Sequence, residues 1–186
     1  MISTIKKWIQ EFKPSLIFLA KFLLAYTVLT FIYSIYLKSF DRSPDIATRW
    51  VTSQTAFLLD TFIAESHSSP NSNKPTVSLF FENVLSVSIY EGCNGINMII
   101  VFIAFIVSFN NDWRNMVWFI PVGILFIHFS NLLRLIALAL ISNRLPDYFY
   151  FFHKYLFTAI IFIAIFILWY IWVVKVKHQN LEPNET

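Results

Sequence analysis

The sequence predicts an all-α integral membrane protein with about four transmembrane helices and a small extracytoplasmic cap, in a single domain over residues 1–186. Composition is the first indication: 57% of the residues are hydrophobic and only 13% are charged, whereas soluble domains carry about a quarter charged residues. The apolar runs are the second, because several approach the roughly 20 residues that a membrane-spanning helix needs. These runs lack polar alternation, so no face can be assigned to water.

The N-terminal region predicts two consecutive helices. Across residues 1–15, isoleucine, tryptophan and phenylalanine recur at helical spacing opposite lysines, which is typical of an interfacial helix, and Pro14 predicts its end. Residues 16–37 form the first predicted span, with Lys21 close enough to its start to extend its amine towards water. The run is too long for a signal peptide and lacks a small-residue cleavage site, so we expect a retained helix.

The extracytoplasmic cap is expected within residues 38–92, which are polar by comparison with the rest of the chain. Residues 50–64 predict a helix with one apolar side. Residues 76–90 alternate between apolar and polar positions around Glu82 and Asn83, a pattern that predicts a small β-hairpin.

Three further spans are predicted at residues 94–110, 115–142 and 154–174, separated by short polar loops. The first of these is short and needs the turns that directly precede its apolar run. The second is long for one span, and Pro121 and Gly123 are the positions at which we expect it to kink.

The distribution of positive charge predicts the orientation of the bundle. Basic residues gather at the chain ends and between the second and third spans: Lys6, Lys7, Lys13, Arg114, Lys175 and Lys177. With an even number of spans, all of them lie on one side, which the positive-inside rule assigns to the cytoplasm together with both termini. The segments assigned to the outside also carry basic residues, so the difference in positive charge between the two sides is only moderate. These residues are Lys38, Arg42, Arg49, Lys74 and Arg144.

This topology brings three polar residues to one depth. Cys93 lies at the outer start of the second span, and His153 at the outer start of the fourth. Arg134 follows Arg114 by 20 residues, or roughly 30 Å of helix, which is about the thickness of the hydrocarbon core. Arg134 is therefore also expected at the outer face.

A cysteine, an arginine and a histidine at one level are suited to acyl transfer through a thiol. The thiolate is the nucleophile, and a helix N-terminus or a neighbouring cation favours it. Cys93 precedes a span and is flanked by Gly92 and Gly95, which allow a substrate backbone to approach. His153 can accept the thiol proton or return one to a leaving amine, and Arg134 can hold a carboxylate or a developing oxyanion.

Each residue also has a structural interpretation. Cys93 can be an apolar filler, Arg134 an interfacial anchor, and His153 a member of the aromatic interface belt. An anchor does not need the depth of Arg134, whose span continues for several more residues. Glu91 is either a helix-start acid or a residue that orients the site. His128 lies deeper than Arg134 and is expected to form a packing hydrogen bond between helices.

Three short patterns occur in order along the chain: Glu91-x-Cys93-Asn94-Gly95, then Asn131-x-x-Arg134, then His153 at the head of the last span. With this topology they resemble the exosortase/archaeosortase family of multipass membrane proteins, in the compact form found in Bacteroidetes. The resemblance covers about residues 76–174. The family more often has serine after the thiol, where this chain has Asn94.

The resemblance implies a cysteine transpeptidase that processes C-terminal sorting signals, which consist of a short motif, a transmembrane segment and a basic tail. It implies that Cys93 is the nucleophile, that Arg134 stabilises the oxyanion or substrate, and that His153 is the general acid and base. Four other residues of these patterns are expected to bind substrate or orient the site: Glu91, Asn94, Gly95 and Asn131.

The resemblance also implies a multipass protein of a bacterial cytoplasmic (inner) membrane. We therefore expect a membrane cysteine transpeptidase or protease whose active site lies on the extracytoplasmic face. Its expected partners are exported proteins with such a signal and membrane lipid, since a net charge of +3 is too small to indicate nucleic-acid binding. No cofactor is expected, and a lone cysteine excludes a Cys-rich metal site. A non-enzymatic scaffold or assembly partner in envelope biogenesis is the main alternative. A transporter is less favoured because the sequence shows no internal repeat.

Overall fold

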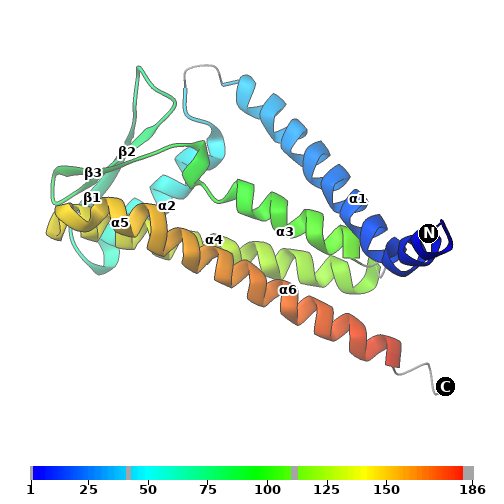
Figure 1. The fold of residues 1–186 in the computed structure, drawn as a ribbon. Helices are drawn as coiled ribbons and strands as arrows, with labels where there is room; N and C mark the ends of the chain where they lie inside the picture. The colour runs from blue at the N-terminus through cyan, green and yellow to red at the C-terminus, as the bar shows by residue number, and fades with distance from the viewer. Residues whose placement is uncertain (1, 41–42, 110–112, 182–186) are drawn as a thin grey trace.

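The structure is a computed structural model that describes residues 2–40, 43–109 and 113–181, and it is mostly helical (Figure 1). Four helices form its bundle: α1 (Ile2–Lys38), α3 (Ile96–Phe109), α4 (Trp113–Arg144) and α6 (Phe157–Leu181). Within the described residues, three helical segments are long and apolar enough to cross a membrane: Phe12–Lys38, Trp113–Arg144 and Pro146–Lys175. Their length and composition are those of a multipass membrane protein, as the sequence predicts.

Helix α1 differs from its prediction at the N-terminal end. It is one helix from Ile2 to Lys38, so the predicted end of an interfacial helix at Pro14 is wrong. A proline inside a helix removes one backbone donor, and an apolar helix tolerates this loss when its remaining hydrogen bonds persist. The interfacial position of residues 1–15 stays a prediction.

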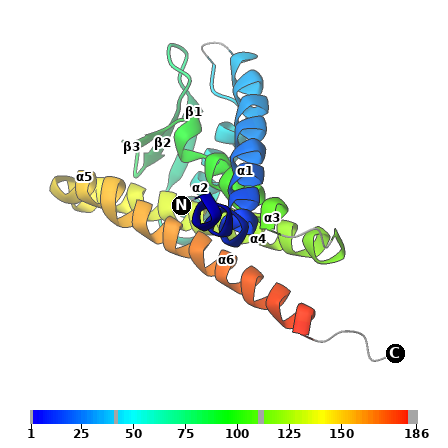
Figure 2. The same cartoon turned by 45° about the vertical axis from the view of Figure 1, so that its right-hand side comes forward.

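Helix α3 is shorter than the span predicted for residues 94–110. Its 14 residues reach about 21 Å, against a hydrocarbon core of about 30 Å. The apolar helices that meet the length of a span therefore number three in the described chain, and not four. Helix α3 nevertheless packs against α1, α4 and α6, in the middle of the bundle (Figures 1 and 2).

The predicted cap consists of one helix and a three-stranded antiparallel sheet. Helix α2 (Ile46–Phe62) begins at Asp45, whose carboxylate accepts a hydrogen bond from the Thr48 N–H at 3.1 Å. The sheet has the order β1-β2-β3, with these bounds: β1 (Ser66–Pro70), β2 (Val77–Phe81) and β3 (Val84–Ile89). The predicted cap helix is confirmed. The fold as a whole is not all-α, because the cap also contains this β-sheet.

The predicted hairpin is confirmed as β2 and β3. Its two turn residues, Glu82 and Asn83, have φ angles of 52° and 61°, as a tight two-residue turn of this hand requires. Strand β2 alternates buried and half-buried residues, in agreement with the sequence pattern. Strand β1 is not predicted because its serine-rich sequence carries no hydrophobic alternation. His67 in that strand stacks on Phe80, with ring centroids 4.8 Å apart.

Two apolar clusters hold the fold together. One joins the cap to the end of α4 and includes Leu59, Phe81, Ile89, Leu135 and Leu138. It fixes the sheet and α2 on the half of α4 that carries Arg134.

The second cluster lies between α3, α4 and α6 and includes Phe102, Ile106, Ile127 and Trp172. Here Gly123 gives close approach, since a Cβ atom on it would lie 2.1 Å from Cζ of Phe102.

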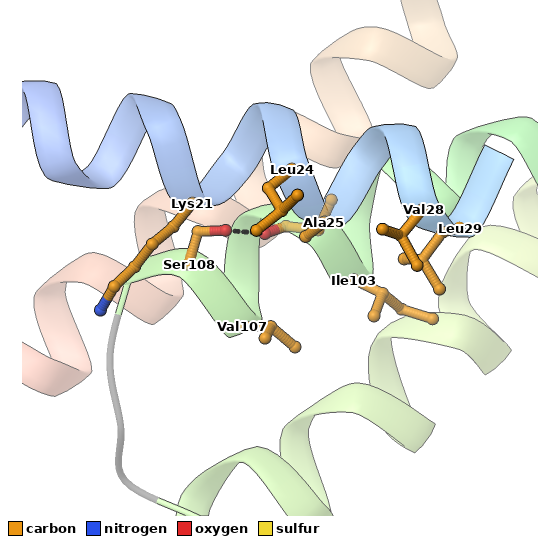
Figure 3. A pocket seen from close by; sticks show the side chains of 9 residues that line it. Lys21, Leu24, Ala25, Val28, Leu29, Ile103, Val107 and Ser108 are labelled. Atoms are coloured by element: carbon orange, nitrogen blue, oxygen red, sulfur yellow. Dashed lines mark hydrogen bonds between the residues drawn. The ribbon is translucent and has the colours of Figure 1, made fainter. Parts of the chain in front are cut away.

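An apolar pocket of about 500 Å³ lies between α1 and α3 (Figure 3). Lys21, Leu24, Ala25, Val28 and Leu29 line it from α1, and an apolar wall of α3 faces them. The Ser108 hydroxyl in that wall donates a hydrogen bond to the Ala104 carbonyl at 2.6 Å (Figure 3).

Candidate active site

A second pocket, of about 470 Å³, lies where the cap meets the bundle. Its walls come from the segment before α3, from α3 and α4, and from the start of the last helical segment: Tyr90, Gly92, Cys93, Met98, Arg134, Tyr150, His153, Lys154, Thr158 and Ile161. The structure thus brings the predicted Cys93, Arg134 and His153 into one pocket. Their catalytic roles stay predictions.

Cys93 ends a short 3₁₀ turn, η1 (Glu91–Cys93), directly before α3. Its N–H donates to the Tyr90 carbonyl at 2.8 Å, and its own carbonyl accepts a hydrogen bond from Nδ2 of Asn131 at 3.0 Å. The residue is 5% exposed. Both backbone bonds fix the loop, so the thiol has a defined position at the edge of the pocket.

Opposing effects act on the pKa of the Cys93 thiol. Burial raises the pKa of Cys93, while the charge of Arg134 and hydrogen bonds from Tyr90 act to lower the pKa. The net pKa is above its ordinary value, so the resting residue is a thiol near neutral pH. Attack by sulfur therefore needs a base, or a rearrangement of charge when substrate binds.

Asn94 directly follows Cys93 in the chain, but it does not line the pocket of Cys93. It is 3% exposed, and its Nδ2 donates to Oη of Tyr33 at 2.9 Å and to Oγ1 of Thr48 at 3.2 Å. Its Oδ1 accepts the Ile96 N–H at 2.9 Å, at the start of α3. The Thr48 hydroxyl in turn donates to Asp45. This buried network joins α1, α2 and the cysteine loop, and it favours an orienting role for Asn94.

The structure also explains why position 95 is a glycine. Its φ is +87°, a conformation that favours glycine, and a Cβ atom would lie 3.3 Å from Cγ of Asn131. The Gly95 carbonyl accepts the N–H groups of Met98 and Ile99, each at 3.1 Å. Gly95 thus starts α3, and Asn131 supports the cysteine loop from α4.

Arg134 lies on α4 one turn after Asn131 and lines the pocket. Its Nε is buried and has no hydrogen-bond partner, and no carboxylate of the described residues pairs with its guanidinium. The side chain as a whole is half-buried, and a buried polar atom without a partner is costly unless another group satisfies it. An anionic or carbonyl group of a bound substrate would satisfy it here.

His153 lies in a π-helical segment, η3 (Phe152–Leu156), between a short helix α5 (Phe149–Phe151) and α6. Its ring stacks on Phe149 with centroids 5.7 Å apart, and it lines the pocket beside Lys154. Segments of this type occur often at functional sites, because the wider turn changes the direction of a side chain.

Two other candidates lie away from this pocket. Glu91 lines a separate pocket of about 260 Å³ together with Lys38 and Asp45. His128 forms a 2.8 Å hydrogen bond with Oε1 of Gln54 on α2 and stacks on Trp50. The prediction that His128 forms a packing hydrogen bond between helices is confirmed.

Sequence reasoning does not identify Tyr90, Tyr33, Asp45 or Thr48 as parts of the site. Tyr90 has a usable signal, because it precedes Cys93 by three residues and a 3₁₀ turn places such residues on one side. Asp45 and Thr48 follow the pattern of a helix N-cap. Tyr33 has no local signal, since its partner Asn94 is 61 residues away.

The chemistry of metal binding is not evident in the part of the chain that the structure describes. There, no group of three or more histidine, cysteine, aspartate or glutamate side chains is close enough to hold an ion. The functional groups that line the pocket include the thiol, the guanidinium and the imidazole, together with two phenols, an amine and a hydroxyl: Tyr90, Tyr150, Lys154 and Thr158.

The fold and the pocket together define a multipass membrane protein with a thiol beside a cation and an imidazole. The chain belongs to the transmembrane exosortase family, whose family model matches residues 13–170 and so confirms the resemblance seen in the sequence. No curated protein and no solved structure matches the chain.

Proposed function

We propose that the protein is a cysteine transpeptidase or peptidase that cleaves exported proteins near a C-terminal membrane anchor. The observation that carries the proposal is the shared pocket of Cys93, Arg134 and His153, in a chain of the exosortase family. Its partners on this proposal are exported proteins with a short motif, a transmembrane segment and a basic tail.

The proposed reaction has two steps. His153 accepts the Cys93 proton, the sulfur attacks the scissile carbonyl carbon, and Arg134 stabilises the resulting oxyanion. The C–N bond then breaks, and the leaving nitrogen takes the proton from His153, which leaves a thioester on Cys93. In the second step an amine or water attacks the thioester carbon, its proton passes to His153, and the thiolate leaves.

The raised pKa of Cys93 is consistent with such a base-assisted step. Because the resting sulfur is protonated, it is protected from unspecific reaction until a substrate carbonyl and the imidazole are both in place. This sequence needs His153 within direct or one-water reach of the sulfur, which stays a prediction.

We further propose that α3 is a fourth, short span and that the pocket faces the outside of a bacterial inner membrane. Helix α3 has no charged residue over its whole length, and a thinner local bilayer can accommodate a short apolar helix. In addition, the N-terminal end of α1 and the C-terminal end of α6 both lie away from the sheet (Figure 1). An even number of crossings agrees with this arrangement.

The test compares Cys93→Ser and Cys93→Ala with the wild type in the native cell after deletion of the chromosomal copy. Without activity, exported proteins should retain their C-terminal anchor and tail, as measured by mass spectrometry of their C-terminal peptides. We expect the wild type to restore cleavage and both variants to fail, since oxygen does not readily form an anion in place of the thiolate.

A non-enzymatic scaffold gives a different result. Cys93→Ser keeps the volume of the side chain nearly constant, and Cys93→Ala removes one heavy atom. A scaffold should therefore retain its role in both variants. Full cleavage by the Cys93→Ser variant, with the protein present at wild-type levels, would exclude Cys93 as the nucleophile.

A further inference from the structure

Tyr90 belongs to the same loop as Cys93, three residues before it. It immediately precedes η1, lines the same pocket as Cys93, and is 45% exposed. Its carbonyl accepts the Cys93 N–H at 2.8 Å, so the turn holds the two residues together.

The ring of Tyr90 is folded back over Gly92. A Cβ atom at position 92 would lie 2.4 Å from Cε2 of Tyr90, 2.8 Å from Cζ and 3.0 Å from the hydroxyl oxygen. The phenol therefore occupies the space where a side chain at position 92 would begin. This placement puts the hydroxyl beside the next residue, Cys93, and the two side chains are close enough for each to shift the pKa of the other.

We propose that Tyr90 is a further catalytic residue, whose hydroxyl donates a hydrogen bond to the Cys93 sulfur and stabilises the thiolate when it attacks and again when it leaves the thioester. This inference rests on the proposed function. Tyr90 then supplies a hydrogen-bond donor from the loop before α3, and Arg134 supplies a positive charge from helix α4. A donor to a charged acceptor is roughly twice as strong as one to a neutral acceptor, so the contact strengthens when the sulfur is ionised.

The Tyr90 phenol keeps its proton while it stabilises the thiolate. Its pKa is raised, chiefly by the charge of Cys93 and then by burial, so Tyr90 remains a donor over the range in which the thiol ionises. Gly92 has a matching role, because only a residue without Cβ leaves the phenol in place.

The test is the pH dependence of Cys93 alkylation by iodoacetamide in the purified full-length protein, which has a single cysteine. Tyr90→Phe removes the donor and keeps the ring. The pKa of the thiol should therefore rise further, and the rate at a fixed pH below it should fall severalfold to about tenfold, one pKa unit being a tenfold change in thiolate. Tyr148→Phe is the matched control, since Tyr148 is exposed and does not line the pocket.

A second variant tests the geometry. Gly92→Ala should displace the phenol and slow alkylation as Tyr90→Phe does, and the double variant should be no slower than either single one, because both remove the same contact. A purely structural role would lower thermal stability without moving the pH profile.

Alkylation profiles of Tyr90→Phe and wild type that superimpose would overturn the inference, whatever the outcome for Cys93 in the cell. Conversely, a shifted profile together with full cleavage by Cys93→Ser would support the contact and refute the proposed function. The two ideas therefore fail in separate measurements.

Discussion

Arg134 places a half-buried positive charge in the same pocket as a thiol that burial keeps protonated. Its Nε is buried without a partner, whereas an interfacial anchor extends its guanidinium to water and lipid headgroups. The same guanidinium contributes to lowering the pKa of Cys93 against the effect of burial. One side chain can thus favour the thiolate at first and the oxyanion later, as the negative charge moves from sulfur to oxygen.

We expect Arg134→Lys to reduce cleavage of the native substrates about 100-fold, the lower end of the loss seen when an oxyanion donor is removed. Lysine keeps the charge but lacks the planar fork of donors. Initial rates of anchor release in isolated membranes provide the measurement. Arg144→Lys is the matched control, at the exposed end of the same helix, and should leave the rate unchanged. Equal rates for both variants would support the anchor interpretation of Arg134.

Among the elements, α3 holds the bundle together and starts at the site. Its N-terminus is built by Asn94 and Gly95, and further along the helix Phe102 occupies the space above Gly123 of α4. A change at the contact with Gly123 therefore alters the position of the helix that follows Cys93.

Gly123→Ala should destabilise the protein by about 1–3 kcal/mol, the usual cost of overpacking a core, because the new methyl group would overlap the Phe102 ring. Thermal unfolding in detergent is the measurement. Val122→Ala, one position earlier on an exposed surface, is the control and should shift the midpoint little. An unchanged midpoint for Gly123→Ala would mean that α3 and α4 can separate at this point without cost.

Local sequence patterns account for the elements that were predicted, and long-range contacts account for those that were not. The β2–β3 hairpin follows from its alternation and its two turn residues. Strand β1 is stabilised by pairing with β2, which its own residues do not indicate. Likewise, apolar runs and charges predict that Cys93, Arg134 and His153 reach one level, but the support of Asn94 by Tyr33 arises only when α1 packs on α3.

On the scale of the whole molecule, the pocket lies at the junction between a polar cap and an apolar bundle. The cap cluster includes Cys93 itself, together with residues of α2, the sheet, α4 and α6. The bundle, by contrast, contributes Met98, Thr158 and Ile161 to the wall of the pocket. A substrate that joins a polar segment to a membrane anchor has the same division.

The number of crossings decides whether this junction faces outward, and the chain is well suited to the experiment because Cys93→Ala removes its single cysteine. Into that background, one cysteine is introduced at a time: Ser3→Cys, Ser72→Cys or Thr186→Cys. A membrane-impermeant maleimide added to intact spheroplasts should label only the Ser72→Cys variant, in the segment between β1 and β2, and should label all three after permeabilisation. This result requires an even number of crossings and makes α3 a span despite its 14 residues. If the maleimide labels one terminus from outside and leaves the other protected, the number is odd. Helix α3 would then enter and leave on one side, and the common depth of Cys93, Arg134 and His153 would need another explanation.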